Sequence, residues 1–388
     1  MKILMLAPEP FFQPRGTPIS VYQRIKALSD LGHEVNLVTY HLGEDKEIKN
    51  LKISRIPNVF FIKKIKIGPS LKKIPLDFLL FLKASGLLVR NKYDLIFSHE
   101  EGALFGVILS KISGIPHIYD MHSSLPQQLE NFDFSRSKLL KRVFLGMERF
   151  ILKNSIVTIV ICLDLLKQVE KEGYAEKAIL LENFIDFDTR EFTAEEIRQK
   201  RKEFASEDKK IVLYAGNFQP YQGIPLLLEA ASQIKNDRIV FVLVGESPAA
   251  VEREKERARE LGIAEKVFFT GQVPPSQMPL FISLADVLVS PRLSGTNTPL
   301  KIYSFLKSAK PLVATNLWTH TQVLSDQISV LVEPDAECMA EGITFALFDD
   351  RARERANFAK EKADRDYTYS RYKEKINQVL DKATGSPG

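Results

Sequence analysis

The sequence has few of the residues that mark several common classes of protein. Its 388 residues include two cysteines, Cys162 and Cys338, without metal-ligand spacing, which argues against a disulfide-rich fold and against a zinc module. We expect both to be buried free thiols in a reducing cytoplasm. No run of 18 apolar residues is free of charge, so no membrane-spanning helix is expected. The opening MKILMLAPEP has too short an apolar run for a signal peptide and predicts a buried strand.

Two further absences narrow the function. There is no G-x-G-x-x-G motif, which argues against a dinucleotide-dependent dehydrogenase. The net charge of +5 is local, because residues 51–100 hold ten Lys and Arg against three Asp and Glu. A nucleic-acid-binding protein would carry a broader basic face, so no nucleic-acid partner is expected. The basic, Phe-rich segment 60–90 fits either peripheral contact with an anionic membrane or a solvated surface backed by a core helix.

Short apolar segments alternate with amphipathic ones along the chain, the pattern of parallel α/β sheets. The expected strands of the first half are Lys2–Leu6, Glu34–Thr39, Asp94–Ser98, His117–Asp120 and Ile156–Ile161. The pattern restarts at Lys210, with expected strands at 211–216, 239–245, 267–271 and 286–290. Expected helices include Ile19–Leu31, Lys138–Lys153, 223–232 and Tyr369–Leu380, followed by a disordered tail from Ala383.

The restart predicts a second doubly wound domain. We therefore expect an α/β protein with two Rossmann-like domains. The first comprises residues 1–185 together with a C-terminal helix at about 366–382, and the second comprises residues 186–365.

In such sheets, ligands bind at the carboxyl ends of strands, beside helix N-termini. In the first domain these positions hold Gly16 and Thr17, the segment SHEEG with His99, and the segment YDMHSS with His122. A histidine at a strand end can hydrogen-bond sugar hydroxyls. The alternatives are a plain turn at Gly16, helix-dipole partners in SHEEG and a satisfied loop histidine at His122.

In the second domain the strand-end candidates lie in AGNFQPYQG, GE, GQVPPSQ and SPRLSGTNTPLKIYSF. They are Gly216, Asn217, Gln222, Gly245, Val273, Arg292, Gly295, Asn297, Thr298 and Lys301. We expect a helix to start at Thr298-Pro299, with free amides that form an anion site with Lys301 and Arg292. A diphosphate would suit such a site, and the alternative is a solvated, capped helix start.

In order and spacing, these segments together resemble the GT-B fold glycosyltransferases, in particular family 4, the retaining nucleotide-sugar transferases. The resemblance covers nearly the whole chain and includes LGHEVNLVTY, YAGNFQPYQGIPLLLEA, TPLKIYSFLKSAKPLVAT and ENFIDFD, which is similar to the family's hinge motif at Asn183 and Asp186. It implies two Rossmann-like domains that face a central cleft.

The resemblance also implies roles for particular residues. It places Gly16 near the donor phosphates and the acceptor, and His122 against the donor sugar. Gly216 would approach the diphosphate, Val273 would stand where a backbone contact reads the base, and residues 296–299 would hold the sugar and phosphate.

The sequence departs from the family pattern where the nucleotide should bind. Thr296 and Ser304 stand where the family usually has two glutamates, the second of which grips the ribose. Asn217 and Gln222 stand where it usually has an arginine and a lysine for the diphosphate. Either Lys301, Arg292 or Arg15 replaces these cations, or the donor differs, or the protein is not an enzyme.

The resemblance implies a retaining, metal-independent hexosyltransferase without a cofactor. It would use a UDP-sugar, or a GDP- or ADP-sugar, and a sugar, lipid-linked or small-molecule acceptor, in surface polysaccharide or glycolipid synthesis. His122, Lys301 and Thr296 are the expected catalytic residues, Ser304 is expected at the ribose, and the expected location is the cytoplasm at the inner face of the membrane. The alternatives are a sugar- or nucleotide-binding pseudoenzyme and a nucleotide-sugar epimerase, although no carboxylate-rich site for epimerisation is evident.

Overall fold

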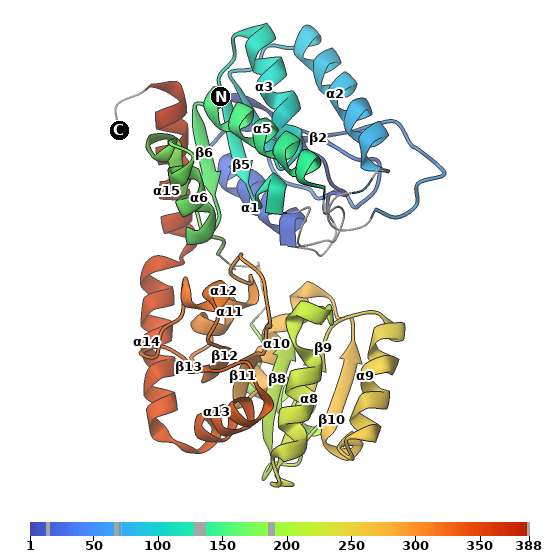
Figure 1. The fold of residues 1–388 in the computed structure, drawn as a ribbon, viewed down its shortest axis with the longest axis vertical. Helices are drawn as coiled ribbons and strands as arrows, with labels where there is room; N and C mark the ends of the chain where they lie inside the picture. Colours follow the sequence, from blue (N-terminus) through green and yellow to red (C-terminus); the bar gives the residue numbers. More distant parts are fainter. Residues whose placement is uncertain (13–15, 66–69, 71, 128–136, 185–190, 386–388) are drawn as a thin grey trace. The chain divides into compact units, whose positions relative to one another are not determined.

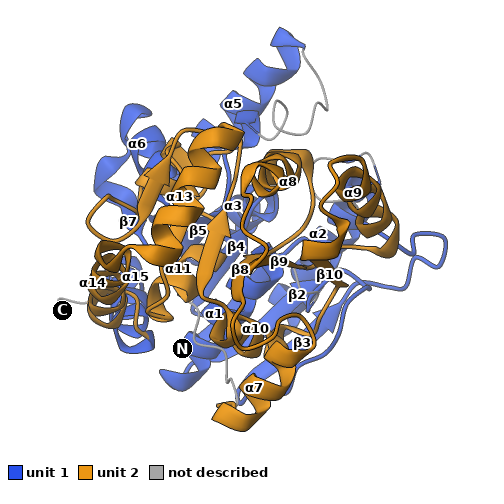
Figure 2. Cartoon of the chain, turned by 90° about the horizontal axis from the view of Figure 1, so that it is seen from below, with its two compact units in different colours: residues 1–183, 369–388 blue, residues 184–368 orange. Residues whose placement is uncertain are grey.

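The computed structural model of the chain describes residues 1–12, 16–65, 70, 72–127, 137–184 and 191–385. Contacts divide the chain into two compact units (Figure 2). Unit 1 comprises residues 1–183 with 369–388, and unit 2 comprises residues 184–368. The division predicted at 185/186, and Asp186 of the hinge-like motif, lie outside the described residues.

Unit 1 is built on a seven-stranded parallel sheet with the order β3-β2-β1-β4-β5-β6-β7. The strands are β1 (Lys2–Ala7), β2 (Glu34–Thr39), β3 (Leu51–Arg55), β4 (Leu95–His99), β5 (His117–Met121), β6 (Val157–Val160) and β7 (Ala178–Leu180). The helices are α1 (Gly16–Asp30), α2 (Lys73–Arg90), α3 (Gly102–Ser113), α5 (Lys138–Asn154), α6 (Leu163–Lys171) and α15 (Tyr369–Thr384).

The central strands of unit 1 are buried, as a parallel sheet covered by helices requires. β1 is buried at every position after Lys2, and β4 and β5 are buried at all their positions. Polar residues in these strands need internal partners. The ring of His117 has them, because it lies 3.0 Å from both Ser98 Oγ and Ser155 Oγ.

The helices of unit 1 lie in two groups. α3 contacts both α2 and α5, so these three helices form one layer (Figure 1). α1 contacts α15, which also contacts β6. The last helix of the chain therefore packs beside the first helix and belongs to unit 1.

Unit 2 has a six-stranded parallel sheet with the order β10-β9-β8-β11-β12-β13. Its strands are β8 (Lys210–Ala215), β9 (Ile239–Val244), β10 (Val267–Gly271), β11 (Val287–Ser290), β12 (Leu312–Thr315) and β13 (Val330–Val332). Its helices are α7 (Ala194–Lys202), α8 (Ile224–Gln233), α9 (Pro248–Glu260), α10 (Met278–Leu284), α11 (Lys301–Lys307), α12 (Trp318–Thr321), α13 (Ala336–Phe348) and α14 (Asp350–Asp366). In both sheets the strand order reverses once, between β1 and β4 and between β8 and β11.

Several expectations need correction. The helix predicted at Thr298-Pro299 starts at Lys301, so the amides of the preceding loop are not part of its first turn. The C-terminal helix extends to Thr384 and includes Ala383, which was assigned to a disordered tail. Cys162 is a buried free thiol as expected, but Cys338 is only half-buried.

Candidate functional site

In unit 2, the reversal of strand order brings together the ends of β8 and β11. Ligands bind at the carboxyl ends of strands at such a reversal. Gly216 follows β8 with a φ of 146°, a backbone conformation that favours glycine. A Cβ atom at Gly216 would lie 2.9 Å from the Tyr214 hydroxyl and 3.5 Å from Lys301 Nζ. These three residues therefore meet at the end of β8.

Gly245, which follows β9, packs against the same turn. A Cβ atom at Gly245 would lie 2.0 Å from the carbonyl oxygen of Gly216. Only glycine lets the two backbones approach so closely. Gly216 and Gly245, which we predicted in separate loops, are thus direct neighbours.

Lys301, the first residue of α11, carries a buried cation at this position. The residue as a whole is partly exposed, but its Nζ atom is buried and has no hydrogen-bond partner among the described residues. Nζ lies 4.0 Å from the centre of the Tyr214 ring. Burial, together with the nearby Arg292, lowers the pKa of Lys301 well below its usual value. An ammonium group without an anion is costly to bury, so the site suits an anionic ligand.

Arg292, in the loop after β11, is a second cation beside Lys301. Its Nη1 atom donates to the carbonyl oxygen of Asn297 at 2.9 Å and to Thr319 Oγ1 at 3.1 Å. Its Nε atom is buried without a partner among the described residues, and burial lowers the pKa of the guanidinium. A Cβ atom at Gly295 would lie 2.6 Å from Arg292 Nη2, so glycine leaves room for this side chain.

The loop between β11 and α11 is held by side chains from the segment that follows β12. Thr319 Oγ1 donates to the carbonyl oxygen of Asn297, and Gln322 Nε2 donates to that of Thr296, both at 2.6 Å. Thr298 is buried in this loop, and its hydroxyl has no partner among the described residues. The predicted residues Thr296, Asn297 and Thr298 thus belong to one fixed loop.

His320, in α12, belongs to the same region, although nothing in the residues around it distinguishes it as a site residue. Its Nε2 atom lies 2.9 Å from Ser290 Oγ at the end of β11, and its Nδ1 atom lies 2.9 Å from the carbonyl oxygen of Thr315. Burial lowers the pKa of His320 to about 4, so the ring is neutral near pH 7.

The other predicted residues of unit 2 have varied surroundings. Asn217 Oδ1 accepts a hydrogen bond from the backbone of Gln219 at 3.2 Å, so its side chain closes its own loop. Gln222 is buried, and its Oε1 atom has no partner in the described part of the chain. Val273 packs half-buried against the core, and Ser304 is partly exposed within α11.

Unit 1 has a different arrangement at the ends of β4 and β5. The buried carboxylate of Asp120 accepts from Arg24 Nε at 2.9 Å. His99 Nδ1 and His122 Nε2 lie 3.3 Å and 3.2 Å from its two oxygens. Although burial disfavours its charged form, Arg24 and the two histidines hold the pKa of Asp120 well below its usual range. Arg24 also donates to the hydroxyl of Tyr372 in α15.

These groups also have the spacing of a metal site. The ligand atoms of His99, Asp120 and His122 lie within 4.8 Å of one another. However, Arg24 Nη2 lies 3.4 Å from the second oxygen of Asp120, so the guanidinium faces both carboxylate oxygens. A divalent cation would share one carboxylate with this guanidinium, and like charges repel. A hydrogen-bonded network therefore fits these residues better than a metal centre does.

Glu100 lies beside this network, in the turn between β4 and α3. Its φ of 48° is unusual for a residue other than glycine. Its Oε2 atom accepts from Ser123 Oγ at 2.8 Å, and burial raises the pKa of Glu100 to about 7. The next residue, Glu101, instead pairs with Lys73 Nζ at 2.6 Å.

The remaining predicted residues of unit 1 lie in the first turn of α1. Gly16 is exposed and Thr17 is half-buried, and the Gly16 carbonyl oxygen accepts from Ser20 Oγ at 3.2 Å. Arg15, which was considered as a replacement cation, lies outside the described residues.

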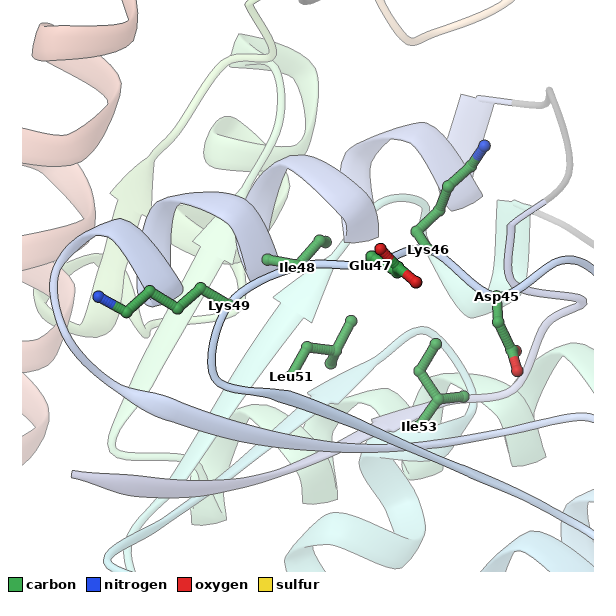
Figure 3. Close-up of a pocket in the computed structure, with 7 residues that line it drawn as sticks. All are labelled: Asp45, Lys46, Glu47, Ile48, Lys49, Leu51 and Ile53. Atoms are coloured by element: carbon green, nitrogen blue, oxygen red, sulfur yellow. The ribbon is translucent and has the colours of Figure 1, made fainter.

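A surface pocket lies elsewhere, against the edge strand β3 and the segment that connects β2 to it (Figure 3). Its lining comprises residues 45–49 with Leu51 and Ile53. The charged ends of Lys46 and Lys49 point away from the side chains of Leu51 and Ile53. It includes none of the predicted site residues, and we assign it no function.

Comparison with known proteins identifies both halves of the chain. The model for glycosyl transferases group 1 matches residues 195–365, and the model for Glycosyltransferase Family 4 matches residues 14–189. A phosphatidyl-myo-inositol mannosyltransferase from Mycobacterium tuberculosis is 23% identical over 100% of this chain and 98% of its own length. An alpha-monoglucosyldiacylglycerol synthase from Streptococcus pneumoniae is 24% identical over 84% of this chain and 74% of its own length.

Solved structures resemble the fold. A sucrose-phosphate synthase from Thermosynechococcus elongatus has a TM-score of 0.81 at 18% identity, with full coverage of both chains. Anabaena HepE in complex with UDP and glucose has a TM-score of 0.78 at 18% identity, covering 98% of this chain and 99% of its own.

The buried Lys301 leads to a prediction about stability. The pKa of Lys301 is lower in the folded protein than in the unfolded chain, so the unfolded chain binds more protons at a pH between these two values. The free energy of unfolding therefore rises with pH across this window. The substitution Lys301→Met should therefore stabilise the protein at pH 7, by about 0.5–2 kcal/mol as for other stabilising substitutions. The gain should shrink as the pH approaches about 10.4.

Urea unfolding of Lys301→Met at pH 7 and pH 10 would measure this difference. Lys307→Met, at the exposed end of the same helix, is the matched control, and we expect it to stay within about 0.5 kcal/mol of the parent. A destabilised Lys301→Met protein would mean that the ammonium group is compensated in the folded state.

Proposed function

Because the chain belongs to the GT-B glycosyltransferases of family 4, we propose that it is a retaining enzyme with a nucleotide-sugar donor. It moves a hexose-type sugar to an acceptor hydroxyl. Relatives named as a mannosyltransferase and as a glucosyldiacylglycerol synthase support the hexose. A UDP-sugar is the first candidate, because Anabaena HepE, a protein of similar fold, has been solved in complex with UDP and glucose. GDP- and ADP-sugars are the alternatives.

The observation that carries this proposal is the buried, unpartnered ammonium group of Lys301 at the end of β8. The leaving diphosphate of a nucleotide-sugar carries the charge that this group lacks. With Arg292, it provides two cations where Asn217 and Gln222 leave the usual positions neutral. We propose that the diphosphate is neutralised from the β11–α11 loop and α11 instead of from the loop after β8.

The reaction then follows from the proposed arrangement. The bond between the anomeric carbon and the phosphate oxygen breaks, and the acceptor oxygen bonds to the same face of the sugar. The acceptor proton passes to a phosphate oxygen, and a nucleoside diphosphate leaves. Lys301 and Arg292 stabilise the developing negative charge, which is where a preorganised cation has its largest effect. His122 contacts the sugar, Ser304 contacts the ribose, and the step requires no metal.

The replacement of both family glutamates, by Thr296 and Ser304, favours one alternative function, that of a pseudoenzyme. A pseudoenzyme would bind the donor and support a partner transferase without turnover. Donor binding by calorimetry, with no nucleotide release across a broad panel of acceptors, would favour that rival.

Nucleotide release from UDP-, GDP- and ADP-hexoses, with sugar and lipid acceptors, tests the proposed activity. In the Lys301→Gln protein, loss of a charge-assisted contact of about 1.5–3 kcal/mol should lower kcat/KM by roughly one to two decades. Lys307→Gln should retain the parent rate. No turnover with any donor, or an unaffected Lys301→Gln protein, would contradict the proposal.

We also propose that unit 1 docks on an anionic bilayer, where it would reach a lipid-linked acceptor at the inner face of the membrane. In α2, the side chains of Ile74, Phe78, Leu82 and Val89 are exposed, Val89 by 87%. Phe60 and Phe61, ahead of this helix, are also exposed. Among the described residues, no helix is long and apolar enough to cross a bilayer.

The neighbouring helices extend this surface beyond segment 60–90. α3 exposes Ile112, and α5 exposes Leu139 and Val143 beside its lysines and arginines. The acidic residues of α2, α3 and α5 are Asp77 and Glu148, and neither is exposed. Every exposed charged residue of these three helices is therefore a lysine or an arginine, and exposed apolar side chains lie among them. Such a surface complements anionic headgroups.

Flotation tests this docking by comparing binding to anionic phosphatidylglycerol vesicles with binding to neutral phosphatidylcholine vesicles. We expect binding to the anionic vesicles that weakens with salt. Phe78→Ser should reduce binding several-fold, because the side chain would enter the interface. Phe358→Ser is the matched control, since Phe358 of α14 in unit 2 is exposed by the same 56% as Phe78. Equal binding to both kinds of vesicle would argue against docking.

A further inference from the structure

We propose that Arg24 and Asp120 are positioning residues that fix the tautomer of His122, with Tyr372 of the C-terminal helix holding Arg24 in place. In this arrangement His122 carries its hydrogen on Nε2 and presents Nδ1 as an acceptor. The catalytic consequence rests on the proposed function, but the tautomer itself does not.

The charge of Asp120 sets the direction of the hydrogen bonds that are made to it. Its side chain is fully buried, and Arg24 is fully buried beside it, with Nε 2.9 Å from one oxygen and Nη2 3.4 Å from the other. This pairing keeps the carboxyl group ionised, and an ionised carboxylate can only accept hydrogen bonds. A ring nitrogen that hydrogen-bonds to it must therefore carry a hydrogen.

His122 is thereby assigned one tautomer. Its Nε2 atom lies 3.2 Å from Asp120 Oδ1, so this nitrogen is the donor. His99 Nδ1 lies 3.3 Å from the other oxygen and 3.4 Å from His122 Nε2. In a neutral imidazole the second nitrogen has a lone pair. Nδ1 of His122 is then suited to accept a hydrogen bond from a sugar hydroxyl.

Arg24 is held from three directions. It belongs to α1, its Nη1 atom donates to the Tyr372 hydroxyl, and its Nη2 atom lies 3.4 Å from the carbonyl oxygen of Leu181. The guanidinium carbon lies 5.2 Å from the centre of the Tyr372 ring. These contacts leave the guanidinium little freedom to turn away from Asp120. The C-terminal helix, 348 residues from Arg24 along the chain, is in this way connected to His122.

The substitution Asp120→Asn would reverse the tautomer for a specific reason. Arg24 donates towards the position of Oδ2, so the amide oxygen of the new side chain should face Arg24. Its NH2 group would then face His122 Nε2, which must become an acceptor. The hydrogen would move to Nδ1, the ring nitrogen that does not face residue 120. Replacement of the aspartate of a Ser-His-Asp triad by asparagine likewise gives the wrong histidine tautomer.

Nitrogen-15 spectra of histidine-labelled protein, without any donor, measure the tautomer directly. His122 is assigned by the signal that disappears in His122→Gln. The parent protein should show His122 protonated on Nε2, and Asp120→Asn should show it protonated on Nδ1. A parent ring protonated on Nδ1 would overturn the inference, and this outcome does not depend on whether Asp120→Asn folds.

Two further measurements separate positioning from general stability. Tyr372→Phe keeps the ring beside Arg24 but removes the hydroxyl, so it should preserve the tautomer, with a smaller loss of rate than Asp120→Asn. Asp120→Asn should lower kcat/KM about tenfold to hundredfold, the effect of one misdirected hydrogen bond. If Asp120→Asn switches the tautomer at an unchanged rate, the positioning role is wrong. If the parent shows the predicted tautomer but no turnover with any donor, the proposed function fails and the assignment of the network stands.

Discussion

Parallel strands that reverse their order at one point leave space at their carboxyl ends, and both units depend on this constraint. In unit 1 the reversal lies between β1 and β4, and in unit 2 it lies between β8 and β11. Residues distant in sequence meet at these edges. Gly216 and Gly245 touch because adjacent parallel strands end at the same level, and Lys301 reaches Gly216 from the helix after β11.

The buried charges at the carboxyl ends of the two sheets differ in whether they have a counterion. In unit 1 the carboxylate of Asp120 is surrounded by Arg24, His99 and His122, and its charge is balanced internally. In unit 2 the ammonium group of Lys301 is buried beside a second cation and has no anion among the described residues. A balanced network fixes geometry, whereas an unbalanced cation favours a ligand that supplies the missing charge. We therefore interpret unit 1 as the part that orients and unit 2 as the part that holds the diphosphate.

Much of the architecture could be predicted from periodicity, because buried parallel strands are continuous apolar runs. β2 and β10 lie at their predicted bounds, and the other predicted strands are within one residue at each end. The start of α11 was placed two residues early, because Pro299 is a favourable first helical residue although the chain stays in the loop there. Arg24 and Tyr372 were missed because each lies in an amphipathic helix, where a charged or aromatic residue has no distinctive spacing. Their significance depends on Asp120, a contact between segments far apart along the chain.

The central claim is that Lys301 meets the diphosphate of the donor, and proton uptake tests it most directly. An anion beside a lysine with a depressed pKa favours its charged form, so binding should draw a proton from the buffer. Calorimetry of UDP binding at pH 9, in two buffers of different ionisation enthalpy, measures this uptake. We predict a buffer-dependent heat in the parent protein and none in Lys301→Met. A heat that is independent of buffer in the parent, or unchanged in the variant, would contradict the account.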